Sequence, residues 1–195
     1  PKPSSAASDV YKRQEETLVD EDLKQIFKSF PKSAHPMGVL SSLTSALIAF
    51  NPQNETKISM TDKEGVTADD KMYLSTVRLL AKFPIMSSWT LRKIKGLPLN
   101  YSNNNLSYTE NIAYMMFAKP NQEYVQNDVI VNALNTLLIL HADHEQNCST
   151  STVRIVGSSY AGLYASISAG ISALWGRLHG GANQAVIEML ELIKN

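Results

Sequence analysis

The stretch from Ile155 to Gly176 contains no charged residue, and it limits the possible folds more than any other part of the sequence. A run of this length could cross a bilayer as a single helix. Its polarity argues against a membrane span, because serine recurs at positions 158, 159, 166, 168 and 172 and glycine interrupts the run at 162 and 170. We therefore expect a helix buried inside a folded protein, and no membrane partner.

Alanine recurs within this stretch at every fourth position, namely 161, 165, 169 and 173. On a helix, residues four apart share one face, and a stripe of small side chains lets another helix approach closely. The stripe predicts either dense packing within one subunit or a helix crossing at a homodimer interface.

Helix signals also dominate the rest of the chain, and the alternation typical of strands is nearly absent. Pro36 is placed for the first position of a helix that continues through Phe50 and is stopped by Asn51 and Pro52. A polar segment without a strand pattern, residues 53–65, follows it as a predicted linker.

Two further helices are predicted between positions 67 and 96. Thr67 can cap the first of them, with Asp69 and Asp70 in its electropositive first turn. Pro84 is predicted to open the second helix, and Gly96 to stop it.

Three more helices complete the pattern. Ser107 and Glu110 form a capping box ahead of a helix at 111–117. A strongly apolar helix is expected at 128–140, and a last one from about 182 to 193. The sequence therefore predicts an all-α fold.

Composition excludes several classes of protein. A chain of 195 residues with 44% hydrophobic residues suits one globular domain or a large piece of one. Lys and Arg together number 18, as do Asp and Glu, so there is no electrostatic case for a nucleic-acid partner or an anionic membrane. The single cysteine, Cys148, excludes an internal disulfide and suits a reducing compartment, so we expect a cytoplasmic protein.

Residues 1–14 are expected to be foreign to the fold. The run from Asp9 to Gln14 resembles the in-frame translation of a transposase adapter used in library sequencing, and the residues before it are of low complexity. An ordinary disordered tail is the alternative. Residues 188–195 stop within a helical pattern without a cap. We therefore expect a fragment of a longer protein, with residues 15–195 as its native part.

The candidate chemistry lies in two histidine-containing segments, 141–147 and 178–183. Three interpretations of the first segment compete. Metal binding would use two imidazoles three residues apart, but the sequence lacks both an HExxH motif and the second Glu-x-x-His pair of a di-iron bundle. His141 could instead simply complement a helix C-terminus. The third interpretation is recognition of a substrate by His144, with the amide of Asn147 nearby.

His179 lies just before the predicted last helix. The positive end of the helix dipole disfavours a protonated ring there and favours a neutral imidazole that donates a hydrogen bond. A neutral imidazole can stabilise a developing enolate. Gly180 and Gly181 leave room for a ligand beside the backbone. The segment therefore predicts a proton donor to a bound polar substrate.

The order and spacing of several longer motifs closely resemble bacterial citrate synthases. The matching motifs are His141 to Asn147, Ser149 to Arg154, Leu174 to Gly176 and His179 to Asn183, together with His35 to Met37, Leu106 to Tyr108 and Met115 to Phe117. The resemblance covers about residues 15–195. It implies a mostly helical homodimer, or a hexamer, that acts as an acyltransferase of the tricarboxylic acid cycle. Such enzymes condense acetyl-CoA with oxaloacetate to citrate and CoA; no metal or cofactor is implied, since acetyl-CoA is a substrate.

The resemblance also implies roles for individual residues. His144 matches the histidine that hydrogen-bonds oxaloacetate, and Asn147 is expected to line the same pocket through water. His179 matches the catalytic histidine that donates a hydrogen bond to the thioester carbonyl of acetyl-CoA. Ser149 matches a serine that orients this histidine.

The resemblance places a second catalytic histidine, an aspartate base and the substrate-clamping arginines downstream of Asn195. The chain is therefore expected to hold most of a large domain, with the start of the small domain at its C-terminal end, and to be inactive by itself. Two alternatives remain. A 2-methylcitrate synthase would use propionyl-CoA, and one methyl group changes binding by only about 1–3 kcal/mol. A non-catalytic helical interaction protein is the other.

Overall fold

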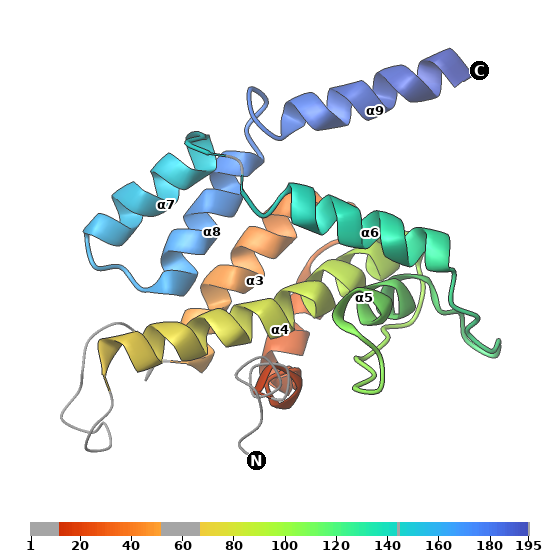
Figure 1. Ribbon diagram of the computed structural model, residues 1–195, viewed down its shortest axis with the longest axis horizontal. Helices are drawn as coiled ribbons and strands as arrows, with labels where there is room; N and C mark the ends of the chain where they lie inside the picture. Colours follow the sequence, from red (N-terminus) through yellow and green to blue (C-terminus); the bar gives the residue numbers. More distant parts are fainter. Residues whose placement is uncertain (1–11, 52–66, 144, 195) are drawn as a thin grey trace.

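The computed structural model describes residues 12–51, 67–143 and 145–194, and this part of the chain forms helices and their connections without a β-strand. The main helices are α2 (Glu21–Ser29), α3 (Pro36–Phe50), α4 (Ala68–Lys95), α5 (Tyr108–Phe117), α6 (Asp128–Leu140), α7 (Cys148–Ser158), α8 (Leu163–Leu174) and α9 (Gly181–Lys194) (Figure 1). The all-α prediction is confirmed. The predicted linker at 53–65 lies outside the described residues.

Helix α3 begins at Pro36 and ends at Phe50, as the sequence predicted. Its N-cap is His35, whose imidazole Nδ1 accepts a hydrogen bond from the Met37 N–H at 3.2 Å. A side-chain acceptor at this position satisfies a backbone N–H that has no partner within the helix. His35 therefore has a structural task that the sequence did not reveal.

Both ends of α4 follow the predicted signals. At the start, Thr67 Oγ1 accepts from the Asp70 N–H at 3.1 Å, and Asp70 Oδ2 accepts from the Thr67 N–H at 2.9 Å. These reciprocal bonds form a capping box. At the other end, Gly96 takes a left-handed conformation with φ of 69°, which glycine adopts without strain.

The prediction that Pro84 opens a new helix is wrong, because Pro84 is buried inside the continuous helix α4. Proline has no N–H, so it leaves the carbonyl four residues earlier without its helical partner. That carbonyl belongs to Leu80, and the hydroxyl of Tyr108 on α5 donates to it at 3.2 Å. A residue from another helix thus compensates for the missing bond.

The core lies where α2, α3, α4, α5 and α8 meet. Trp89 of α4 is at its centre, 1% exposed, and its ring centroid lies 5.7 Å from that of Phe27 and 5.6 Å from that of Tyr101. The indole Nε1 donates to the Asn100 carbonyl at 2.7 Å, so burial of its polar atom is compensated. The apolar residues of this core are Leu23, Phe27, Val39, Leu40, Leu43, Leu47, Ile85, Met86, Trp89, Met115 and Ile171.

A buried cation joins α4 to the end of α5. Arg92 is 0% exposed; its Nε donates to the Pro98 carbonyl, and its Nη1 donates to the Ala118 carbonyl at 2.8 Å. The last carbonyls of a helix lack intrahelical partners and carry partial negative charge. The guanidinium therefore caps α5 from the side.

Helix α8 packs between α7 and α3. Towards α3, the Ser41 hydroxyl lies 2.7 Å from the Ser172 hydroxyl, and Ser168 Oγ donates to the Ser41 carbonyl at 2.8 Å. Towards α7, a Cβ built on Gly170 would lie only 2.6 Å from Val153 Cγ2. The alanine stripe predicted a close helix contact, with packing within one subunit as one possibility. Such a contact is present, and it is made by glycine and serine residues that neighbour the alanines.

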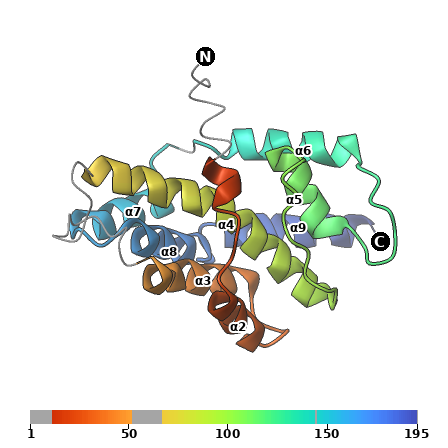
Figure 2. The same cartoon turned by 90° about the horizontal axis from the view of Figure 1, so that it is seen from below.

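Three helices are less enclosed. In the described part of the chain, α6, α7 and α9 contain no buried residue. Helix α9 extends away from the packed helices (Figure 1), and α6 lies beside α5 at one edge of the fold (Figure 2). Apolar side chains on α6 and α9 are exposed, among them Ile139, Leu140, Leu192 and Ile193. None of the helices at 12–51, 67–143 and 145–194 is long and apolar enough to span a bilayer.

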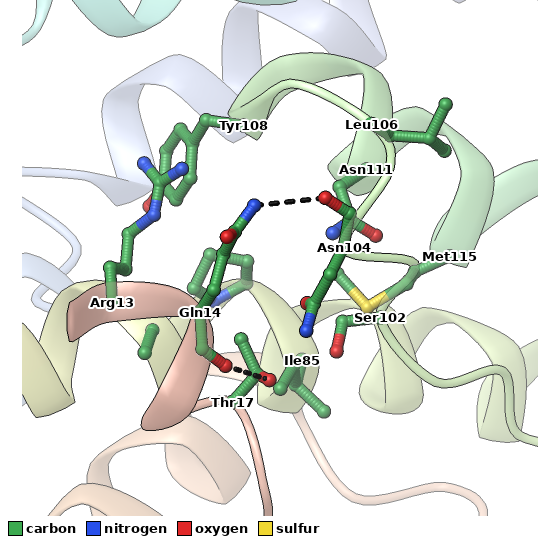
Figure 3. A pocket seen from close by; sticks show the side chains of 12 residues that line it. Arg13, Gln14, Thr17, Ile85, Ser102, Asn104, Leu106, Tyr108, Asn111 and Met115 are labelled. Atoms are coloured by element: carbon green, nitrogen blue, oxygen red, sulfur yellow. Dashed lines mark hydrogen bonds between the residues drawn. The ribbon is translucent and has the colours of Figure 1, made fainter. Parts of the chain in front are cut away.

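The segment that starts at residue 12 packs against α4 and α5. Gln14 Nε2 donates to the Asn104 carbonyl at 2.9 Å, and the Arg13 guanidinium lies 4.4 Å from the centroid of the Tyr108 ring (Figure 3). These residues line a small pocket of about 20 Å³. Residues 1–11 lie outside the described part, and the foreign origin of residues 1–14 stays a prediction.

Candidate active site

His179 and Ser149 come together at the junction of α7, α8 and α9. Ser149 is in the first turn of α7, and His179 is in the connection between α8 and α9, two residues before α9 begins. The imidazole Nε2 lies 3.0 Å from Ser149 Oγ, and both residues are partly buried. The pairing predicted for these two residues is thus present in the structure.

The Ser149 hydroxyl has a second neighbour, the Gly170 carbonyl of α8, to which it donates at 3.0 Å. A hydroxyl has one proton, and a carbonyl only accepts. When that proton points to Gly170, the His179 Nε2 must carry a proton that it donates to Oγ. When it points to Nε2 instead, the single N–H of a neutral ring is at Nδ1. The orientation of the Ser149 hydroxyl therefore selects the tautomer of His179.

The backbone of the connection folds back on the end of α8. The Leu174 carbonyl accepts from the Gly180 N–H at 2.8 Å, and the Gly176 carbonyl accepts from the N–H groups of His179 at 2.9 Å and Gly181 at 3.2 Å. A Cβ built on Gly180 would lie 2.3 Å from the Leu174 oxygen. Glycine is therefore required at 180 by the close approach of two backbone segments.

Asn147 is the N-cap of α7, and its Oδ1 accepts from the Thr150 N–H at 2.9 Å. This bond satisfies one of the backbone donors at the helix start. It leaves the Asn147 amide nitrogen, a donor, for another partner. Asn147 is half-buried and lies two residues from Ser149, so it belongs to the same end of α7.

The loop between α6 and α7 contains a strained residue. Glu145 has φ of 56°, in the left-handed region that residues with a side chain seldom adopt. The Asp143 carboxylate holds this turn by accepting from the Glu145 N–H at 3.0 Å. His141 ends α6, and its Nδ1 lies 2.7 Å from the Leu137 carbonyl, consistent with the structural interpretation of that histidine. His144 lies outside the described residues, so its predicted role stays a prediction.

Two hollows flank the His179 segment. One of about 180 Å³ lies between the start of α3 and the start of α9 and is lined by His35, Trp175, Gly180 and Gly181, among others. The other is an open, mostly apolar groove of about 350 Å³ between α7 and α8, and Ser149 and Gly170 line it. Both are large enough for part of a small-molecule ligand.

Sequence reasoning missed two features of this site. Gly170 was noted only as an interruption of the apolar run, yet its carbonyl competes for the Ser149 proton. Trp175 was noted only as part of a motif, yet its ring stacks on the imidazole of His35 with centroids 4.8 Å apart. A sequence shows no signal for such a contact, because the two residues cap different helices, α3 and α8.

Comparisons with known proteins extend this picture. The family described as "Citrate synthase, C-terminal domain" matches residues 2–195. Citrate synthase 1 of Mycobacterium tuberculosis is 50% identical over 182 residues, which are 93% of this chain and 40% of the relative. The citrate synthase of Corynebacterium glutamicum is 48% identical over 184 residues, which are 92% of this chain and 39% of the relative.

Solved structures agree with the sequence relatives. The crystal structure of citrate synthase from Pyrobaculum aerophilum gives a TM-score of 0.83 at 28% identity, over 98% of this chain and 46% of that one. The structure of the Thermotoga maritima enzyme gives a TM-score of 0.74 at 25% identity, over 99% and 46%. The chain spans about 40% of the length of the curated relatives it matches. Because the family match extends over nearly all its residues, the chain belongs to the citrate synthase family.

Proposed function

We propose that the protein containing this chain condenses acetyl-CoA with oxaloacetate to give citrate and CoA. The observation that carries the proposal is the hydrogen-bonded pair of His179 and Ser149, held by a glycine-rich turn in a chain of this family. In the reaction, a base removes a proton from the acetyl methyl group. The resulting enolate carbon attacks the keto carbon of oxaloacetate, and water then cleaves the thioester.

His179 is proposed to stabilise the enolate. Proton removal from the methyl group moves negative charge to the thioester oxygen, and a positioned N–H donor lowers the energy of that charge. Since Nε2 faces Ser149, the donor to the substrate has to be Nδ1–H. This requires the Ser149 hydroxyl to turn its proton from the Gly170 carbonyl to Nε2. Ser149 thus acts through His179: its hydrogen bond to Nε2 keeps the N–H proton of the neutral imidazole on Nδ1, the nitrogen that faces the substrate.

Oxaloacetate is proposed to bind at the neighbouring end of α7. The resemblance assigns this task to His144 and Asn147. The Asn147 oxygen already accepts from the Thr150 N–H, so the amide N–H groups are the part of this side chain that can contact a substrate carboxylate, directly or through water. The base, the second catalytic histidine and the clamping arginines are proposed to come from the remainder of the protein.

We further propose a cytoplasmic enzyme that assembles as a homodimer or a hexamer. Exposed apolar side chains on α6 support an assembly, because contiguous apolar surface of this kind is usually covered in a functional protein. The single cysteine, Cys148, supports a reducing compartment.

The test is turnover by the full reading frame that contains residues 15–195. CoA release should depend on oxaloacetate, and His179→Ala should lower kcat by about 10²- to 10⁴-fold, the usual range for one positioned proton donor. Acetyl-CoA and propionyl-CoA should be compared in the same assay, since a preference for propionyl-CoA would favour a 2-methylcitrate synthase. A His179→Ala enzyme within twofold of wild type would remove the proposed role.

A further inference from the structure

Trp175 is the first residue after α8, and its ring lies against the start of α3. The ring stacks on the imidazole of His35, with centroids 4.8 Å apart and planes at 21°. A Cβ built on Gly38 would lie 3.4 Å from the ring atoms Cη2 and Cζ3, so one edge of the indole contacts the first turn of α3. Two residues thus contact the Trp175 ring: His35, the N-cap of α3, and Gly38 in its first turn.

This anchor stands at the beginning of the turn that carries His179. The turn is closed by backbone hydrogen bonds from Gly180 to Leu174 and from His179 to Gly176. Such bonds fix the turn internally and relative to the last residues of α8. The Trp175 side chain adds a contact between the turn and α3, a separate element, whereas Leu178 in the same turn is 96% exposed.

The anchor and the Ser149 contact act on opposite ends of the same short segment. Ser149 hydrogen-bonds the ring of His179 from the side of α7, while Trp175 holds the start of the turn against α3. Trp175 and His35 also line the hollow of about 180 Å³ that reaches Gly180 and Gly181, the residues directly after His179. A shift of the Trp175 ring would therefore change both the hollow and the path of the backbone into His179.

We infer that Trp175 is a positioning residue: stacked on His35 and with its ring edge against Gly38, it sets the backbone turn so that the His179 ring meets Ser149. The inference rests on the proposed role of His179 for its effect on catalysis, but the placement of the ring can be measured independently. Displacing a reacting group by about 1 Å can cost about 10²-fold in rate. Loss of the anchor should therefore reduce kcat more than it changes the KM for oxaloacetate.

The first experiment measures the His179 ring directly, by nitrogen NMR of the histidine side chains in this chain. Trp175→Ala should shift the His179 ring resonances, and Trp175→Phe should restore them, because a phenyl ring can still stack on His35. His35→Asn provides a second variant that keeps the fold: asparagine can still cap α3, but the aromatic stack is lost. It should shift the same resonances. His179 resonances unchanged in both Trp175→Ala and His35→Asn would overturn the inference.

The second experiment measures turnover in the full reading frame. Trp175→Ala should lower kcat by about 10- to 100-fold, Trp175→Phe by less than threefold. Tyr160→Ala is the matched control, since Tyr160 is an aromatic residue in the preceding connection and is 80% exposed. If His179→Ala abolishes turnover but Trp175→Ala leaves kcat unchanged, the positioning role fails and the proposed function stands. If the wild-type full reading frame shows no oxaloacetate-dependent turnover, the proposed function fails. If His179→Ala leaves turnover unchanged, only the proposed role of His179 fails. In both cases the NMR comparison alone decides the placement of the ring.

Discussion

The imidazole Nε2 of His179 lies 3.0 Å from the hydroxyl oxygen of Ser149, thirty residues earlier in the sequence. The two residues meet because α7 and α8 pack closely, with Gly170 of α8 against Val153 of α7. Neither Gly170 nor Val153 is proposed to take part in catalysis, yet their contact sets the distance between the two helices. Helix packing thus determines the geometry of the site. Its consequences can be tested at several positions.

Ser149→Ala should lower kcat by about 10- to 100-fold in the full reading frame, less than His179→Ala. The change removes the hydroxyl proton that selects the Nδ1–H tautomer of His179, but keeps the ring. Substrate KM values should change less than kcat. Ser158→Ala is the control, because the Ser158 hydroxyl donates to the Ile155 carbonyl of its own helix and, among the described residues, to no part of the site. Equal kcat for Ser149→Ala and wild type would show that the serine does not orient the ring.

Gly180→Ala should both destabilise the protein and reduce turnover. The added Cβ would stand 2.3 Å from the Leu174 oxygen, so the turn must open. We expect a loss of about 1–3 kcal/mol in the free energy of unfolding, measured by urea denaturation. Gly157→Ala in α7 is the matched control: its Cβ would meet Ser166 Oγ at 3.7 Å, an ordinary contact, and alanine favours a helix. A Gly180→Ala protein as stable as Gly157→Ala would contradict the close approach.

The helix boundaries could be predicted wherever the signal was local. Pro36, the N-cap at Thr67 and the stop at Gly96 act within a few residues, and the structure confirms all three. The prediction that Pro84 opens a helix was wrong because the deciding contact is not local. The interpretation of Pro84 depends on whether another part of the chain can satisfy the Leu80 carbonyl, and the Tyr108 hydroxyl that does so lies on a different helix.

The site likewise combines features that the local sequence predicts with features that depend on tertiary contacts. His179 and Ser149 could be proposed because they stand in motifs of a known family, and the start of α9 follows from a helix pattern. The competition between Gly170 and His179 for one proton could not be predicted, since it depends on how closely α7 and α8 approach. Tertiary distances of this kind are not encoded in any short run of residues.

Tyr108→Phe should destabilise the protein by about 1 kcal/mol, because it removes the donor to the Leu80 carbonyl, which has no helical partner. For a chain of this length, that corresponds to a fall in Tm of about 2–4 °C. Replacing Pro84 by alanine restores a backbone N–H that can reach the same carbonyl. The double variant Tyr108→Phe, Pro84→Ala should therefore lose less free energy of unfolding than the sum of the losses in the two single variants. Strict additivity in this cycle would mean that the two residues do not share Leu80.

The stability that Glu110 contributes should be lost in acid. Its carboxylate accepts from the Ser107 N–H at 2.7 Å, and hydrogen bonds from Ser107 hold the pKa of Glu110 below its ordinary value. A carboxyl with a depressed folded pKa contributes stability above its unfolded pKa and loses it as pH falls through the folded pKa. Wild type should therefore melt above Glu110→Gln at pH 7, and the difference in Tm should vanish below the ordinary range of glutamate. A difference that stays constant down to pH 3 would exclude the carboxylate as its source.

The isolated chain of 195 residues should form no citrate, even with both substrates saturating. Its described residues supply one imidazole, His179, and one N-cap amide, Asn147, at the site. Condensation also needs a base for the methyl proton and a donor for the keto oxygen, and the two substrate carboxylates need counter-charges such as arginines. We propose that the remaining length of the full protein provides these groups, since the chain spans about 40% of its relatives.

The measurement is CoA release by the purified chain, followed with a thiol reagent in the presence and absence of oxaloacetate. No release above the rate without protein is expected, whereas the full reading frame should turn over under the same conditions. His179→Ala of the isolated chain serves as the control for contaminating enzyme, because a contaminant would be indifferent to that change. Release that depends on oxaloacetate and disappears in His179→Ala would show that the base lies within these 195 residues. In that case the candidates are the carboxylates in the turn before α7, Asp143 and Glu145, and the strain of that turn would then have a catalytic explanation.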